Sequence, residues 1–197
     1  GAPGVNRDHG TPHNPWAQVH HVPGGSSSGS AVAVAAGLVP AALGSDTGGS
    51  VRIPASLCGT VGLKTTIGQV SRAGVFPISS TLDSVGPLTR TVEDSALLYQ
   101  AMHGPDPRDR STANAADQDV LSSLKNGVRG VRIAFAEDTF WDDTNPQVTQ
   151  AVRAVGDVFE GLGAHIEQIK FSEAAEVLQA NPRLLISSVE GHLAHEE

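Results

Sequence analysis

Two glycine–serine loops carry the residues best suited to chemistry. The first is GGSSSGS at residues 24–30, and the second is GSDTGGS at residues 44–50. Glycine tolerates positive φ and lets a ligand approach the backbone, while a serine hydroxyl donates, accepts or attacks. Two such loops between Pro23 and Lys64 predict a site lined by backbone amides and hydroxyls.

Several catalytic motifs compete for these loops. Residues 25–29 match the G-x-S-x-G elbow of α/β-hydrolases, but a loop-like stretch precedes them and no later histidine has a recognisable setting. No lysine follows either loop as a phosphate-binding loop requires, and the dinucleotide fingerprint is absent. The remaining interpretation is serine chemistry in which a lysine amine replaces histidine as the base, with a hydroxyl relaying the proton.

The elements around the loops follow from periodicity and capping. Residues 30–37 form a predicted helix capped by Ser28 or Ser30, and residues 38–44 form a buried strand. A helix opening at 51–55 would place Ser50 at its N-terminus, where a developing oxyanion is favoured. Residues 61–87 are turn-rich, with short strands at 69–71 and 75–78.

The rest of the chain predicts an α/β pattern. A capping box at Thr91 opens a helix that ends before Gly104; its predicted inward residues are Val92, Ala96, Leu97, Tyr99 and Met102. Residues 105–126 are predicted to be a surface connection. A βαβ unit follows at 128–171, with strands at 131–136 and 164–171 and a helix capped by Asn145–Pro146. Another helix is predicted near Pro182.

Composition excludes several function classes. The chain has 197 residues, a net charge of −8 and one cysteine, so we expect neither a nucleic-acid partner nor a disulfide framework. No apolar run reaches the ~20 residues of a membrane span, and we expect a cytoplasmic protein. The N-terminal histidines follow no metal-ligand spacing. The chain lacks an initial Met and stops within an apparent helix, so we expect a piece of a longer protein, with a tag remnant as the alternative.

Several linked motifs resemble the amidase signature family. They are GGSSSGSA from Gly24, GSDTGGSVR from Gly44, CGTVGLK from Cys58 and TLDSVGPLTR from Thr81. The resemblance covers residues 12–109, and 128–171 resemble the segment that follows. It implies an α/β fold, a mixed twisted β-sheet core covered by helices on both faces, with residues 1–197 forming one partial amidase domain. It implies no cofactor and no metal.

The resemblance also implies roles for the loop residues. Ser50 matches the nucleophile that forms the acyl-enzyme, and Ser26 matches the bridging serine that follows a cis peptide bond. The oxyanion hole is carried by the amides of Thr47, Gly48, Gly49 and Ser50. The residues implied to support the loops are Asp46, Arg52 and Ser27.

The family's catalytic lysine lies upstream of the first loop, and no lysine precedes Ser26 here. The resemblance therefore implies an amidase of linear carboxamides whose lysine lies outside this chain. Two alternatives stay open: the glutamine amidotransferase A-type subunit, which supplies ammonia for Gln-tRNA formation, and a non-catalytic fragment. Ile53 stands where that subunit typically has Gln, which favours a general amidase. The expected partner is a small amide substrate, and a homodimer is compatible with the sequence.

Overall fold

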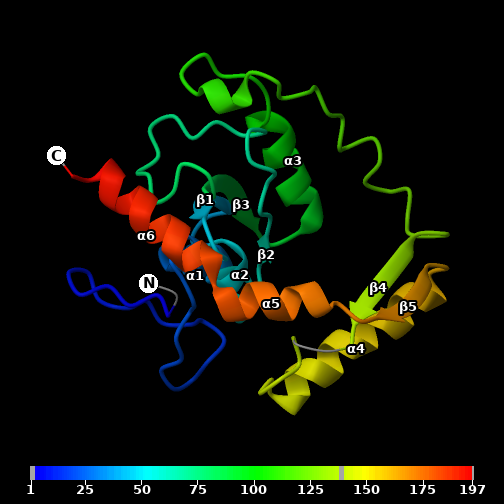
Figure 1. Cartoon of the computed structure of the whole chain (residues 1–197). Coiled ribbons are helices and arrows are strands. Elements are labelled where there is room, and N and C mark those ends of the chain that lie inside the picture. Colours follow the sequence, from blue (N-terminus) through cyan, green and yellow to red (C-terminus); the bar gives the residue numbers. More distant parts are fainter. Residues whose placement is uncertain (1–2, 138–139, 197) are drawn as a thin grey trace. The chain divides into compact units, whose positions relative to one another are not determined.

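The computed structural model describes residues 3–137 and 140–196, which divide into two compact units (Figure 1). One unit contains the chain up to Leu124 together with the segment from Leu185 onward, and the other runs from Lys125 to Leu184. The first unit comprises α1 (Ser28–Ala35), β1 (Ala41–Asp46), α2 (Arg52–Cys58), β2 (Val61–Gly62), β3 (Ser84–Thr89), α3 (Val92–Met102) and the 3₁₀ turn η1 (Arg110–Thr112). The α/β class is confirmed.

The first unit is built on an antiparallel sheet with strand order β1-β3-β2. The central strand β3 is buried along its whole length and pairs Asp46 of β1 with Ser84. The prediction of turns over 61–87 missed this strand, because Gly86 and Pro87 normally argue against a central strand. Both fit here: the carbonyl of Pro87 accepts a hydrogen bond from the Leu63 amide at 3.1 Å, and a Cβ on Gly86 would lie 1.8 Å from the Leu63 carbonyl oxygen.

The predicted short strands between β2 and β3 are largely wrong. Val70 forms only an isolated bridge to His103, and residues 75–78 are not in a strand. This segment instead folds as a loop whose amides bind acidic side chains, and Asp83 accepts hydrogen bonds from the amides of Ile78 and Ser79. Local alternation does not reveal such long-range polar anchoring.

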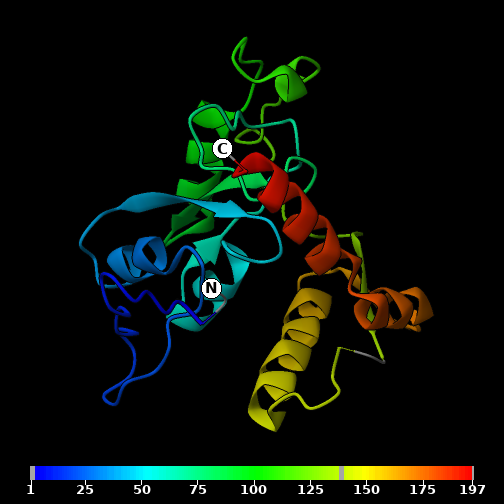
Figure 2. The ribbon, with the colours of Figure 1, turned by 60° about the vertical axis from the view of Figure 1, so that its left-hand side comes forward.

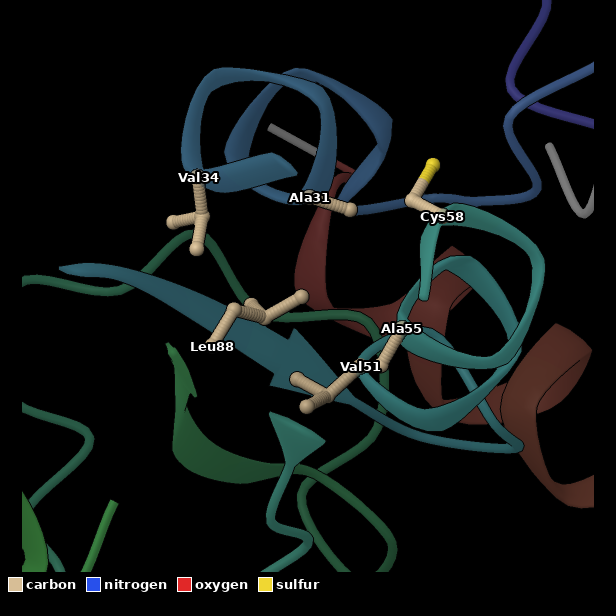
Figure 3. Close-up of a cluster of buried hydrophobic side chains, with 6 residues drawn as sticks. All are labelled: Ala31, Val34, Val51, Ala55, Cys58 and Leu88. Atoms are coloured by element: carbon tan, nitrogen blue, oxygen red, sulfur yellow. The ribbon is translucent and has the colours of Figure 1, made fainter. Parts of the chain in front are cut away.

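Helices α1 and α2 lie against the sheet, and small side chains form the core between them (Figures 2 and 3). This core joins residues from α1, from α2 and its N-cap, and from β3: Ala31, Val34, Val51, Ala55, Cys58 and Leu88. All are 3% exposed or less. The segment between β1 and α2, which contains the second loop, is thereby held at both of its ends.

The helix predicted after Thr91 is confirmed as α3, with the Thr91 hydroxyl accepting the Asp94 amide at 3.0 Å. Its predicted inward face is partly wrong. Ser95 and Tyr99 are buried against the sheet, whereas Val92 is 62% exposed and Leu97 50% exposed. Leu97 follows Ser95 by two residues, about 200° around the helix, and therefore points away from the sheet.

The second unit contains the predicted βαβ arrangement. β4 (Arg132–Ala136) and β5 (His165–Ile169) pair in parallel, and α4 (Pro146–Gly161) connects them. The Asn145 side chain caps α4 by accepting the Gln147 amide at 2.9 Å. α5 (Ser172–Ala180), which was not predicted, follows. The helix predicted near Pro182 is α6 (Pro182–Ala194), which belongs to the first unit from Leu185 onward. None of the helices in the described ranges combines the length and apolarity needed to cross a bilayer.

Candidate active site

The first serine loop leads directly into α1. The Gly25–Ser26 peptide bond is cis, the geometry that the resemblance implies for this position, and Ser26 is exposed. The helix is capped at Ser27 rather than at Ser28 or Ser30, and no side chain caps it. The Ser27 hydroxyl instead donates to the Ser45 carbonyl at 3.3 Å, which ties the start of α1 to β1.

The second loop is organised by one buried carboxylate. Asp46, at the end of β1, is fully buried and accepts the amides of Gly49 at 2.7 Å and Val51 at 3.1 Å. The Arg52 guanidinium adds two hydrogen bonds, 3.0 Å from Nε and 2.9 Å from Nη2. Burial raises the pKa of Asp46, but the hydrogen bonds from Arg52, Val51 and Gly49 outweigh it, so the pKa lies below its ordinary value. The carboxylate is therefore charged at neutral pH.

The structure brings the two loops together. The Ser27 amide donates to the Ser50 carbonyl at 3.1 Å. The two loops also approach closely at Gly44, where the Cβ of any larger residue would lie 2.5 Å from the Ser27 hydroxyl oxygen. Ser50 is half-buried and directly precedes Val51, the N-cap of α2. Both predicted serines thus lie on neighbouring loops at the edge of one sheet.

The backbone amides of the second loop have different partners. The Gly49 amide donates to Asp46, so it orders the loop. Among the described residues, the amides of Thr47, Gly48 and Ser50 donate to no protein acceptor. Three of the four predicted donor amides therefore have no protein acceptor among the described residues, while the fourth, that of Gly49, is already engaged.

Sequence reasoning missed two side chains that support this loop. The Thr47 hydroxyl donates to the Asp83 carboxylate, and the Ser84 hydroxyl donates to the Asp46 carbonyl at 3.1 Å. Both supporting residues lie within the TLDSVGPLTR motif. The motif supported the family resemblance but did not predict these contacts with the second loop, because the contacts depend on the β1–β3 pairing.

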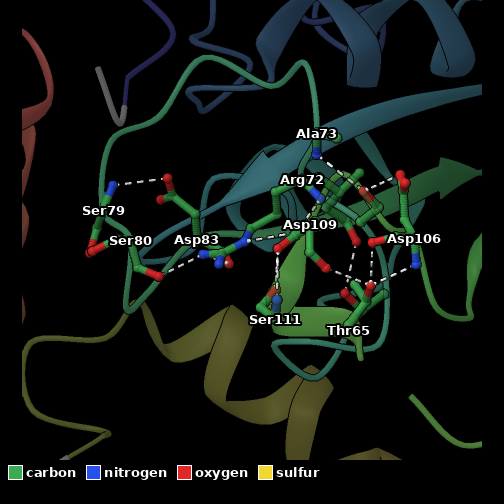
Figure 4. Close-up of polar contacts among 12 residues, drawn as sticks. Thr65, Arg72, Ala73, Ser79, Ser80, Asp83, Asp106, Asp109 and Ser111 are labelled. Carbon is green, nitrogen blue, oxygen red and sulfur yellow. Dashed lines mark hydrogen bonds and ion pairs between the residues drawn. The ribbon is translucent and has the colours of Figure 1, made fainter. Parts of the chain in front are cut away.

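A polar cluster holds the loop before β3 in place (Figure 4). Its centre is Arg72, whose guanidinium donates to the Ser80 carbonyl at 2.7 Å and whose amide donates to Asp109 at 2.8 Å. Asp83 closes the same loop on the Ser79 amide at 2.8 Å. The predicted surface connection, residues 105–126, is therefore anchored near Asp109. Asp83 is held in place by the amides of the loop before β3.

In the first unit, the described residues include one lysine, Lys64, and its Nζ donates to the neighbouring Thr65 carbonyl at 2.9 Å rather than to either serine. Within the described ranges there is no group of three or more His, Cys, Asp or Glu side chains that could hold a metal ion.

The structure thus places two glycine–serine loops in contact within an α/β unit. The Amidase family model matches residues 2–196. The chain therefore belongs to the amidase family, whose members with similar structures are amidase signature enzymes.

Individual relatives include both amidotransferase subunits and amidases. The A-type subunit of glutamyl-tRNA(Gln) amidotransferase from Bacillus velezensis is 47% identical over 181 residues, which cover 92% of this chain and 37% of the relative. The crystal structure of the corresponding protein from Thermotoga maritima is 41% identical, with a TM-score of 0.84 over 93% of this chain and 40% of that one. Peptide amidase from Stenotrophomonas maltophilia is 37% identical, with a TM-score of 0.73 over 86% of this chain and 35% of that one. The chain thus spans well under half of each relative.

Proposed function

We propose that the protein carrying this chain is an amidase that hydrolyses the C–N bond of linear carboxamides through an acyl-enzyme on Ser50. The observation that carries the proposal is the hydrogen bond from the Ser27 amide to the Ser50 carbonyl. It sets the loop of Ser26 beside that of Ser50, next to three amides without a protein acceptor among the described residues. A nucleophile, a proton relay and oxyanion donors are the parts that acyl transfer requires.

The proposed reaction proceeds in two stages. Ser26 takes the proton of the Ser50 hydroxyl as the Ser50 oxygen attacks the amide carbonyl carbon. The amides of Thr47, Gly48 and Ser50 stabilise the resulting oxyanion. The C–N bond then breaks, Ser26 returns the proton to the departing amine, and water hydrolyses the ester on Ser50 to release the acid. Asp46 and Arg52 keep the loop in shape, and Gly49 contributes its amide to Asp46.

Ser26 needs a base, since a serine hydroxyl alone is too weakly basic to hold a proton from Ser50 at neutral pH. We propose that a lysine outside this chain deprotonates Ser26. A desolvated lysine amine titrates low enough to serve in this role.

The test is Ser50→Ala in the full-length protein that carries this chain, with Ser30→Ala as a matched control. Ser30 belongs to the first glycine–serine motif but lies in α1, and its hydroxyl donates to the Leu43 carbonyl at 2.8 Å. Wild type and Ser30→Ala should be labelled by a fluorophosphonate and should turn over a small amide. Ser50→Ala should do neither, and mass spectrometry should place the wild-type adduct on the peptide containing Ser50. Full turnover by Ser50→Ala would refute the proposal.

The 47% identity to an amidotransferase component favours a second candidate, in which the same site releases ammonia from glutamine for a partner-bound tRNA. Ile53 lies over the second loop, where its Cδ1 would be 2.7 Å from a Cβ on Gly49. An apolar side chain at this position offers no hydrogen bond to a glutamine head group. The two candidates separate in an ammonia-release assay: the amidotransferase component would need companion subunits to deliver ammonia, whereas a free-standing amidase would not.

The non-catalytic alternative is a module that only binds amides or anions with its loops. It predicts saturable ligand binding that survives Ser50→Ala, together with no fluorophosphonate labelling of the wild type. Labelling of wild-type Ser50 excludes this alternative.

A further inference from the structure

The peptide unit between Asp46 and Thr47 is held from two sides. Its carbonyl oxygen accepts the Ser84 hydroxyl at 3.1 Å, and the adjoining Thr47 side chain donates its hydroxyl to Asp83. This peptide is trans. In a planar trans peptide the C=O and N–H bonds point in opposite directions, so fixing the carbonyl of Asp46 also fixes the direction of the Thr47 N–H.

The two holding groups are themselves rigid. Asp83 is 5% exposed and Ser84 is 2% exposed, at the buried start of β3. Ser84 faces Asp46 directly in the β1–β3 register. The second oxygen of Asp83 accepts the amides of Ile78 and Ser79 at 2.8 Å each, and Figure 4 shows Asp83 between Ser79 and Arg72. Asp83 therefore cannot turn away from Thr47 without leaving the amides of Ile78 and Ser79 unpaired, of which the Ser79 amide is buried.

We propose that Asp83 and Ser84 are positioning residues that aim the Thr47 N–H at the carbonyl oxygen of the amide substrate. The inference rests on the proposed function. Neither side chain touches the substrate; both act through the backbone of Thr47. They differ in this from Asp46, which holds the loop through the amides of Gly49 and Val51, and from Arg52, whose guanidinium donates to Asp46.

Such positioning acts on the transition state more than on the bound substrate. An oxyanion donor must meet the oxygen of the tetrahedral intermediate at about 2.7–3.1 Å, and losing one donor costs about 10²–10³ in kcat. A donor that is kept but misdirected should cost less. We therefore expect kcat to fall about 10–100-fold, with KM little changed, when either hold on the peptide is removed.

The test measures kcat, KM and melting temperature in the full-length protein that carries this chain. Ser84→Ala removes the hold on the carbonyl, and Thr47→Val removes the hydroxyl at nearly constant volume. Both should lower kcat about 10–100-fold, and Thr47→Ser should recover most of the Thr47→Val loss. The affinity for an aldehyde that forms a tetrahedral adduct on Ser50 should fall by the same factor as kcat.

The matched control is Thr65→Val. The Thr65 hydroxyl is buried like that of Ser84, but it donates to the Val85 carbonyl of β3 at 2.8 Å and not to the second loop. This variant should lower the melting temperature without the parallel loss of kcat and aldehyde affinity. Asp83→Asn is the second probe, because its amide can still face Thr47 while its oxygen accepts the amides of Ile78 and Ser79. That amide can donate to the Thr47 oxygen in place of accepting its proton, but it loses the charge-assisted bond, so kcat should fall less than in Thr47→Val while the loop before β3 stays folded.

The outcomes separate the inference from the proposed function. If Thr47→Val and Ser84→Ala keep wild-type kcat and aldehyde affinity while Ser50→Ala is inactive, the positioning inference is wrong and the nucleophile assignment stands. If Thr65→Val loses as much kcat as Ser84→Ala, the effect is general destabilisation and the inference is also overturned. If the wild type shows no Ser50-dependent turnover, the proposed function fails and the inference falls with it.

Discussion

Replacing Asp46 by asparagine should selectively loosen the second loop. The buried carboxylate uses one oxygen for Gly49 and Arg52 Nη2, and the other for Val51 and Arg52 Nε. Asparagine supplies only one acceptor oxygen, so its NH₂ group must face either the Gly49 or the Val51 amide. One buried amide then loses a hydrogen bond to a charged group, which costs about 1.5–3 kcal/mol.

The ion pair adds less to this cost. The Arg52 side chain is 52% exposed, so solvent screens it and its share is about 0–1 kcal/mol. The expected loss for Asp46→Asn is therefore about 2–4 kcal/mol. Because about 1.36 kcal/mol corresponds to a factor of ten, the opening constant of the loop should rise about 30-fold to 1000-fold.

Hydrogen exchange followed by mass spectrometry measures this change in the peptide that covers residues 44–58. Arg52→Gln is the matched control: it removes the exposed partner but leaves both backbone amides on Asp46, so exchange should rise less than in Asp46→Asn. Unchanged exchange in Asp46→Asn, or an equal effect in Arg52→Gln, would refute the view that the buried amides dominate.

The same variant tests the pH dependence. The pKa of Asp46 lies below its ordinary value in the folded protein, so the unfolded chain binds this proton more readily. The carboxylate therefore contributes its full stability above the unfolded pKa of about 3.9. This contribution is lost as the pH falls from that value through the folded pKa. The difference in stability between wild type and Asp46→Asn should shrink over this acidic range; a constant difference would contradict the assignment.

Two further predictions concern the elements that carry the site. Gly86→Ala should destabilise the first unit by about 3 kcal/mol or more, because its Cβ would overlap the Leu63 carbonyl. Gly29→Ala, with open space around it, should leave the melting temperature unchanged or raise it, and an equal loss in both variants would contradict the packing argument. Thr91→Ala should cost about 1 kcal/mol by removing the α3 cap, as measured by urea unfolding, while Thr91→Ser should retain most of it. If Thr91→Ser is as destabilising as Thr91→Ala, the hydroxyl cap is not the cause.

Local chemistry accounts for the parts of the fold that the sequence predicts well. Thr91 and Asn145 cap helices with their own side chains, as their positions in the sequence predict. The strand–helix–strand order of the second unit follows from periodicity and short connections. The buried faces of the helices were predicted less well. Leu97 is exposed although helical periodicity predicts that it points inward, because the buried face depends on what the helix packs against.

The two glycine–serine loops could be predicted to form a site from residue types alone, because clustered glycines and serines are unusual in a segment that serves structure only. Their roles needed tertiary structure. Only the β1–β3 pairing brings Ser84 and Asp83 to the second loop, and only the folded loop shows that Gly49 donates to Asp46. The central strand itself contains Gly86 and Pro87, which local rules oppose in such a strand. Gly86 fits because a Cβ there would overlap the Leu63 carbonyl oxygen, and Pro87 accepts a hydrogen bond from the Leu63 amide. Residue types thus predicted a serine site, and long-range hydrogen bonds decided which amides of the second loop are already engaged.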